Sequence, residues 1–218
     1  MGKSITAGSI YLILYNAACT AGWAYCLFLT FTAWQNGNTP AQLWVQLKDP
    51  LTYVQTAAVM EVVHALVGLV RSPWMTVAVQ VASRILLVWC YSRPYVSCQS
   101  HWSLFLMVAS WSCAEIPRYL FYICAQFQEG HEIPYVLFFL RYSLFMVLYP
   151  TGISGECLQM YAFYAGAKLP ADQTMVYITM AIGVLYVFGG PGMVGNMLAN
   201  RKREFKKRNE AIEGKKAK

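Results

Sequence analysis

The chain has 218 residues, of which 57% are hydrophobic and 12% are charged, with a mean hydropathy of +0.40 and a net charge of +7. Soluble domains carry about 25% charged residues, so this composition excludes an ordinary soluble domain and indicates an integral membrane protein. The length allows one bundle of helices and little else.

Six apolar stretches follow one another along the chain, each close to the roughly 20 residues that cross a bilayer as a helix. They cover residues 10–32, 51–70, 75–91, 102–124, 134–157 and 175–199. Only helices or closed barrels satisfy the backbone in lipid, and these stretches lack the alternation of barrel strands. We therefore predict an all-α polytopic membrane protein with six transmembrane helices in one bundle, residues 1–200, followed by a basic tail, residues 201–218.

The distribution of lysine and arginine predicts the orientation. With six spans, one side of the membrane holds Lys3, Arg71 and nine basic residues of the tail, and the other side holds Lys48, Arg93 and Lys168. This bias of eleven against three predicts that both termini are cytosolic. Because the tail accounts for the net charge, we expect contact with anionic membrane lipid and no nucleic acid partner.

The chain ends in KKAK, and Lys215 and Lys216 fit a dilysine signal for retrieval to the endoplasmic reticulum. In a tail already rich in lysine, the sequence leaves open whether the motif acts as a signal.

Several residue patterns predict neither a metal nor a cofactor. The seven cysteines form no C-x-x-C pair and fit buried apolar positions, and three histidines on separate segments are too few for a membrane di-iron site. GPGMVG, residues 190–195, satisfies G-x-G-x-x-G, but no strand precedes it. Glycines that let a helix bend or pack closely explain it better.

Ionisable residues at membrane depth are the strongest indication of a site. A charge at the bilayer centre costs about 2.5–3.5 kcal/mol, so such groups are expected to face the interior, pair with one another and carry function. Glu115 and Arg118 are three apart and share a helical face. Glu61 and Arg84 are expected to meet across neighbouring helices, either as a structural ion pair or as part of a site. The full set is Glu61, His64, Arg84, Glu115, Arg118, Arg141 and Glu156.

The fifth stretch contains an acid and a phenol on one helical face. Tyr149 and Glu156 are seven residues apart, about 10.5 Å along an ideal helix, which is too far for both to act on one small group. Pro150 and nearby glycines predict a kink that folds the two side chains toward one cavity. The alternative is that the helix ends at Pro150 and leaves Glu156 in the luminal headgroup layer. As a pair the two groups can move two protons without a cofactor, and the residues leave open which is acid and which is base.

The motifs EVVHALVGLVRSP, W-S-AEIPRYLFY and FLRYSLFMVLYPTGISGE resemble the protein-tyrosine-phosphatase-like A family, the (3R)-3-hydroxyacyl-CoA dehydratases of the endoplasmic reticulum membrane. The resemblance runs from about residue 10 to residue 200 and implies that Tyr149 and Glu156 are catalytic. The supporting or substrate-binding positions that it implies are Glu61, Gln80, Arg84, Glu115, Arg118, Arg141 and Gly152.

This resemblance implies dehydration of 3-hydroxyacyl-CoA to trans-2-enoyl-CoA, the third step of very-long-chain fatty acid elongation. It also implies association with the condensing enzyme, the ketoacyl reductase and the enoyl reductase of the cycle. Because CoA is cytosolic and Glu156 is predicted toward the lumen, the pantetheine arm is expected to reach deep between the helices. The nucleotide end is then expected near cytosolic basic residues.

Three other functions remain to be weighed. No cysteine has an arginine six positions later, so the thiolate chemistry of tyrosine phosphatases is excluded. A transporter also fits buried charges and broken helices, although no internal repeat relates the first three spans to the last three. A non-catalytic scaffold of the elongation machinery is disfavoured by the intact Tyr149 and Glu156.

Overall fold

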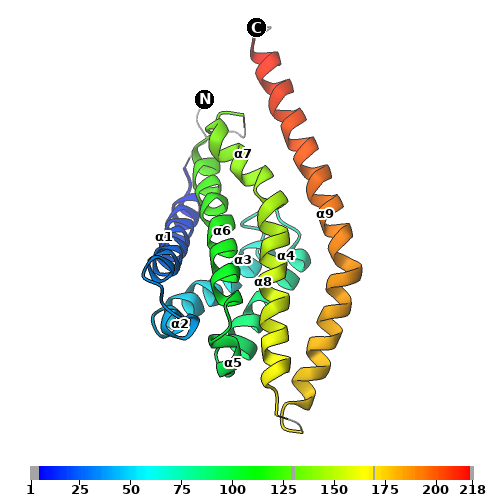
Figure 1. Ribbon diagram of the computed structural model, residues 1–218. Helices are drawn as coiled ribbons and strands as arrows, with labels where there is room; N and C mark the ends of the chain where they lie inside the picture. The colour runs from blue at the N-terminus through cyan, green and yellow to red at the C-terminus, as the bar shows by residue number, and fades with distance from the viewer. Residues whose placement is uncertain (1–4, 129–130, 169, 217–218) are drawn as a thin grey trace.

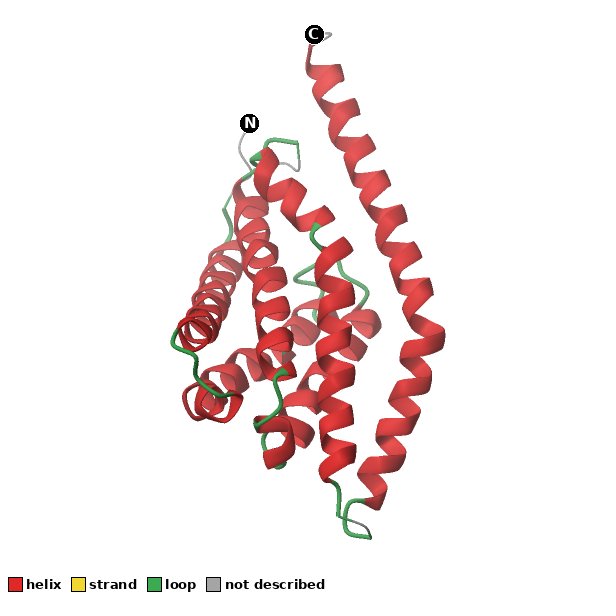
Figure 2. Cartoon of the chain, in the orientation of Figure 1, coloured by secondary structure: helices red, strands yellow, loops and turns green. Residues whose placement is uncertain are grey.

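The computed structural model describes residues 5–128, 131–168 and 170–216, and every regular element within these ranges is helical (Figures 1 and 2). The predicted all-α class is therefore confirmed. The elements are α1 (Ala7–Gln35), α2 (Pro40–Ala57), α3 (Val59–Leu66), α4 (Trp74–Leu86), the π-helical turn η1 (Leu87–Ser92), α5 (Val96–Gln99), α6 (Ser103–Phe127), α7 (Tyr135–Ser143), α8 (Phe145–Gly166) and α9 (Gln173–Lys216).

The helix α6 lies in the middle of the bundle and packs on α1 on one side and on α8 on the other (Figure 1). The elements α2 and α5 lie toward one end of the bundle, and α3 and α4 lie behind the middle of α6 and α8 (Figure 1). The long helix α9 runs along the outside, beside α7 and α8, and extends past the other elements. The first turn of α1 and the last turns of α9 lie at the same end of the molecule (Figure 1).

The core forms where α1, α6 and α8 meet. Trp23 of α1 and Met107 of α6 are fully buried. The backbones of α6 and α8 approach closely at Gly155, where an added Cβ would lie 2.9 Å from backbone atoms of Met107. Small residues allow such close contact between membrane helices, so Gly155 sets the separation of α6 and α8.

The outer surface of the bundle is largely apolar. Large side chains such as Phe28, Val79 and Phe188 are 61%, 68% and 79% exposed. Soluble monomers rarely expose extended patches of this kind, so lipid is the solvent that this surface suits.

By length and composition, three helices can cross a membrane: Ala7–Gln35, Trp74–Ser92 and Gln173–Gly214. The bent pair Tyr135–Ser143 and Phe145–Gly166 makes a fourth if it counts as one span. The 25-residue α6 is not in this set, because Glu115, Arg118 and several serines lower its hydropathy. The count of six spans therefore remains a prediction.

The predicted span over residues 51–70 is wrong as a single helix. The helix α2 starts eleven residues earlier, at Pro40, where Thr39 and Gln42 form a capping box. It ends at Ala57, and α3 follows after Ala58 as a separate helix of eight residues. The chain then turns at Gly68, which has a φ of +72° that glycine adopts without strain.

The helix α9 continues beyond the predicted end of the sixth span and includes the basic tail. An added Cβ at Gly192 or Gly195 would meet nothing within 4 Å, so close packing does not explain these glycines. The side chains of Lys215 and Lys216 lie outside the described part of the chain.

Candidate active site

The helix α8 carries both Tyr149 and Glu156, and it runs unbroken through Pro150 to Gly166. The alternative that the helix ends at Pro150 is therefore wrong. The bend lies at Leu144, where α7 and α8 meet at 43°. Because a proline disturbs the turn that precedes it, the bend falls before Tyr149 and not between Tyr149 and Glu156. The expected kink between the two side chains is thus also wrong.

Glu156 is buried and accepts two hydrogen bonds from uncharged donors. The indole Nε1 of Trp111, on α6, donates to its Oε1 at 2.8 Å. The hydroxyl of Tyr186, on α9, donates to its Oε2 at 2.6 Å. Neither donor carries a charge, so both carboxylate oxygens are held by neutral side chains.

Tyr149 is half-buried, and its hydroxyl points to the same helix that supplies Tyr186. The hydroxyl lies 3.5 Å from the carbonyl oxygen of Gly190. Gly190 and Tyr186 are four positions apart, about one turn of α9. Tyr149 and Glu156 therefore contact neighbouring turns of α9. Both side chains lie between α8 and α9, although α8 has no kink between them.

A network of buried ion pairs joins α3, α4 and α6. Glu115 accepts hydrogen bonds from Arg84 and, at 2.6 Å, from Nε of Arg118. Arg118 also donates to both oxygens of Glu61, at 2.7 and 2.6 Å, and Tyr119 donates to the same carboxylate. The expected pairing of Glu61 with Arg84 is wrong, because Arg84 pairs with Glu115 and Glu61 pairs with Arg118.

The remaining predicted positions form no ion pair with this network, although Arg141 and Arg118 both contact the Tyr122 ring. The Arg141 guanidinium donates to the Tyr122 hydroxyl at 3.2 Å. Gly152 is buried against Ser110, where an added Cβ would make an ordinary contact of 3.7 Å. Gln80 is exposed on α4 and is not brought to the other site residues.

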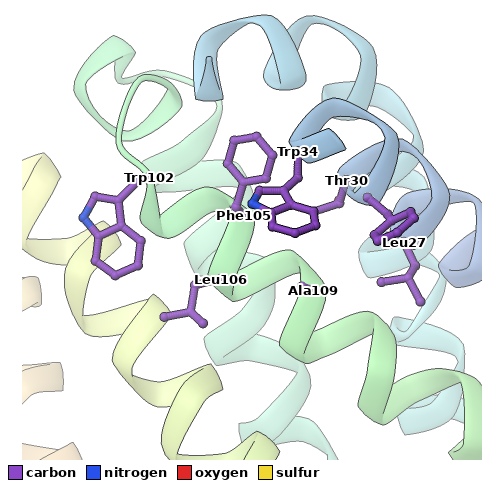
Figure 3. A pocket seen from close by; sticks show the side chains of 8 residues that line it. Leu27, Thr30, Trp34, Trp102, Phe105, Leu106 and Ala109 are labelled. Carbon is purple, nitrogen blue, oxygen red and sulfur yellow. The ribbon is translucent and has the colours of Figure 1, made fainter. Parts of the chain in front are cut away.

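An apolar hollow of about 440 Å³ opens between α1 and α6 (Figure 3). Neither Tyr149 nor Glu156 lines it, so it is not the place where the two groups act. Its lining consists of Leu27, Thr30, Phe31, Trp34, Trp102, Phe105, Leu106 and Ala109.

Trp111 and Tyr186, the two residues that hold Glu156, were not predicted from the sequence. Both are neutral, whereas buried charge was the signal that indicated a site. The position of Trp111 gives a weak indication of a role in the site, since it stands four residues before Glu115 in a motif that contains charged residues. Tyr186 has no local signal, because nothing in an apolar helix indicates which of its aromatic residues faces an acid 30 positions earlier.

Comparison with known families decides the relationship. The family described as "Protein tyrosine phosphatase-like protein, PTPLA" matches residues 55–207, which is more than half of the chain and includes the ion-pair network, Tyr149, Glu156 and Tyr186. The chain belongs to the PTPLA family.

Curated relatives of this PTPLA chain are very-long-chain (3R)-3-hydroxyacyl-CoA dehydratases. One from Caenorhabditis elegans is 43% identical over 152 residues, covering 70% of this chain and 69% of the relative. PASTICCINO 2 from Arabidopsis thaliana is 38% identical over 213 residues, covering 91% and 94%. Dehydratase 2 from Homo sapiens is 37% identical over 152 residues, covering 70% and 59%. No solved structure matches the chain significantly.

Proposed function

We propose that this chain dehydrates very-long-chain (3R)-3-hydroxyacyl-CoA to trans-2-enoyl-CoA, with Tyr149 and Glu156 as the acid-base pair. The relatives named as dehydratases include one that aligns along nearly the full length of both chains. The reaction needs one base, one acid and no redox partner, which matches a phenol and a carboxylate on one helical face.

One observation carries the choice of Glu156. Glu61 and Glu115 each form ion pairs with arginines, which occupy their carboxylate oxygens. Within the described residues, Glu156 is held by the neutral donors Trp111 and Tyr186 and by no ion pair. Of these three acids, it is therefore the one whose oxygens are not occupied by an arginine, which favours it as the group that meets the substrate.

The hydrogen-bond directions support Glu156 as the base and Tyr149 as the acid. An indole N–H can only donate, so Oε1 of Glu156 is an acceptor, as a base requires. A backbone carbonyl can only accept, so the Tyr149 hydroxyl next to Gly190 carries its proton, as an acid requires. The Glu156 carboxylate takes the C2 proton, and the electrons of that C–H bond form the C2–C3 double bond as the C3–O bond breaks. Tyr149 protonates the departing hydroxyl, water leaves, and the proton on Glu156 returns to the phenolate.

The test is an assay of the purified chain in detergent with a long-chain (3R)-3-hydroxyacyl-CoA, following the enoyl-CoA product. We expect Glu156→Gln and Tyr149→Phe each to lower kcat by at least about 100-fold, since general acid or base catalysis contributes about 10²–10⁴-fold. Tyr161→Phe is the matched control: Tyr161 is also on α8 but is 61% exposed. Ordinary turnover by either Glu156→Gln or Tyr149→Phe would overturn the assignment.

We also propose that the chain spans the endoplasmic reticulum membrane six times, with both termini in the cytosol. Two observations support this topology. Basic residues are in excess near the termini, and the start of α1 and the end of α9 lie at the same end of the molecule (Figure 1). A glycosylation acceptor placed in the loop at residues 167–172 should be modified, and one placed after residue 208 should not. The reverse pattern would contradict the orientation.

Association with the condensing enzyme, the ketoacyl reductase and the enoyl reductase is part of the same proposal. An enoyl or hydroxyacyl intermediate with a very long chain is insoluble in water, so transfer between enzymes in one membrane avoids release. Crosslinking in isolated membranes, followed by detection of these three enzymes, tests the association.

A further inference from the structure

From the surroundings of Arg141 we propose that this residue, with Asn200 and Arg201, binds a phosphate group of the substrate's CoA. The inference rests on the proposed dehydratase function and adds to it the place where the hydrophilic end of the substrate is held. Three observations support it: Arg141 is incompletely paired, a small hollow lies beside it, and a known length of α9 separates this hollow from Tyr149.

Arg141 has unused hydrogen-bonding capacity. Its guanidinium donates to the Tyr122 hydroxyl and lies 5.6 Å from the ring centres of both Tyr122 and Tyr142. Its Nε is buried and has no hydrogen-bond partner. Buried donors are nearly always satisfied, so this guanidinium is short of acceptors, which an anion bound at its exposed nitrogens can supply.

The space next to Arg141 fits a phosphoryl group. A hollow of about 60 Å³ is lined by Arg141, Tyr142, Phe145, Met197 and Asn200. A hollow of this size holds a few water molecules, which suits a single phosphoryl group. The planar guanidinium can donate two parallel hydrogen bonds to phosphate oxygens.

The local charge favours an anion. Arg201 of α9 donates through Nε to the Ser143 hydroxyl at 3.0 Å, two residues after Arg141, so a second guanidinium stands beside the same junction of α7 and α8. Glu204, an acid on the facing segment of α9, already pairs with Arg203 and Lys207. No carboxylate pairs with Arg141 in the described part of the chain.

The position of the hollow relative to the membrane also fits. Asn200 directly follows the last predicted membrane residue, 199, and the basic tail begins at Arg201. By the predicted orientation, the hollow thus lies at the cytosolic boundary, which is the side from which CoA thioesters arrive.

The helix α9 supplies a measure of distance. Asn200 lines the hollow, and Gly190, ten residues earlier, contacts the Tyr149 hydroxyl. Ten residues of α-helix correspond to about 15 Å. Between its phosphorus and its sulfur, the pantetheine arm has about twelve chain atoms, equal to about four residues of extended backbone, or roughly 15 Å. A phosphate at Arg141 therefore places the thioester next to Tyr149.

The test compares two thioesters of the same 3-hydroxyacyl group: one of CoA, and one of N-acetylcysteamine, which lacks the phosphates. For Arg141→Gln we expect KM for the CoA thioester to rise about tenfold or more, since charge-assisted bonds to phosphate are among the strong ones. KM for the N-acetylcysteamine thioester should stay within about twofold of wild type. Lys206→Gln, which removes an exposed charge from the same helix, should change neither value. Equal changes on both substrates, or none on either, would overturn the proposal.

A second measurement needs no variant, so it holds even if Arg141→Gln does not fold. Phosphopantetheine should inhibit the wild-type chain competitively, and pantetheine should inhibit at least about tenfold more weakly. Equal inhibition by the two compounds would overturn the phosphate site.

Two further experiments distinguish a CoA phosphate from a lipid headgroup, and failure of the phosphate site from failure of the dehydratase function. Repeating the assay with and without anionic phospholipid tests the other source of phosphate: if the Arg141→Gln effect requires the lipid and is the same for both thioesters, the bound phosphate is a headgroup and the CoA assignment is wrong. If the wild-type chain forms no enoyl product from either thioester, the proposed function itself fails. If the wild-type chain forms product but Arg141→Gln changes KM equally for the two thioesters, only the phosphate site is refuted.

Discussion

The hydroxyl of Tyr186 donates a 2.6 Å hydrogen bond to Glu156, across the boundary between α9 and α8. The helix α9 packs only along one side of the bundle, so this bond ties an outer helix to the buried carboxylate. Trp111 holds the other oxygen of Glu156 from α6. The carboxylate is therefore oriented by one residue from α6 and one from α9, and its direction depends on α9 staying in place.

Removal of the Tyr186 hydroxyl should affect turnover more than binding. In Tyr186→Phe the ring remains and Glu156 loses one donor, so the carboxylate is less well oriented toward C2 of the substrate. A hydrogen bond to a charged group contributes about 1.5–3 kcal/mol, which corresponds to a fall in kcat of about 10- to 100-fold. KM and the thermal midpoint should change little. Steady-state kinetics and a melting curve in detergent provide the measurement.

Tyr91→Phe is the control for that variant. The Tyr91 hydroxyl also links the bundle to α9, through Thr179 at 2.8 Å, but it does not touch Glu156. Thr179 keeps its bond to the Met175 carbonyl, so no group is left unpaired. If Tyr91→Phe lowers kcat as much as Tyr186→Phe does, Tyr186 acts merely by attaching α9, and its role in orienting Glu156 is refuted.

The two glycines of α8 near Glu156 should respond differently to alanine. At Gly155 an added Cβ would lie 2.9 Å from the backbone of Met107, and backbone atoms cannot move aside cheaply. Gly155→Ala should therefore push α6 and α8 apart, cost about 1–3 kcal/mol of stability and displace Glu156 from Trp111. At Gly152 the nearest atom is Ser110 Cβ at 3.7 Å, so Gly152→Ala should be tolerated. Melting curves and kcat of the two variants test this difference. Equal thermal midpoints and equal kcat for Gly155→Ala and Gly152→Ala would contradict the packing argument.

Within the ion-pair network, Glu115 should matter more than Glu61. The Glu115 side chain is 3% exposed and neutralises two arginines, whereas that of Glu61 is 15% exposed and pairs with one. Removing one partner from a buried ion pair costs about 3–5 kcal/mol, because the other charge stays buried. Glu115→Gln should thus abolish or strongly reduce folding, and Glu61→Gln should cost less. The yield of monodisperse protein and the thermal midpoint measure this order; the opposite order would show that Glu61 is the central acid.

The sequence was sufficient to predict the helical class and the positions of α1, α4 with η1, and α6, because long apolar runs depend on local composition alone. It also predicted that Glu115 and Arg118 share a face, since helical spacing is fixed. The choice of partner across helices was not predictable. Arg84 meets Glu115 and not Glu61 because the helices that pack together, and their depth relative to one another, are properties of the whole bundle.

Two further differences have the same origin. Pro150 was expected to bend the chain between Tyr149 and Glu156, but a proline acts on the turn before it, and the bend lies at Leu144. Trp111 and Tyr186 were missed because a neutral donor costs little in an apolar helix and leaves no mark in the composition. Charge indicates where a membrane protein is polar, but the neutral residues that hold the reactive group become visible only in three dimensions.

The loop between α8 and α9 should make stability sensitive to acid through Asp172. This carboxylate accepts bonds from the Lys168 backbone N–H and the Tyr95 hydroxyl, both at 2.7 Å, and these bonds hold its pKa below the usual range. A group with a lowered pKa in the folded state stabilises the fold above its ordinary pKa, and this stabilisation is lost as the pH falls through the folded value. The burial of Tyr95 and its bond to Asp172 raise the pKa of the phenol to about 12, so the donor keeps its proton throughout. We expect the thermal midpoint of the wild type to fall more steeply on acidification than that of Asp172→Asn, which carries no titrating group at this position. Parallel curves for the two proteins would show that Asp172 does not couple the loop to pH.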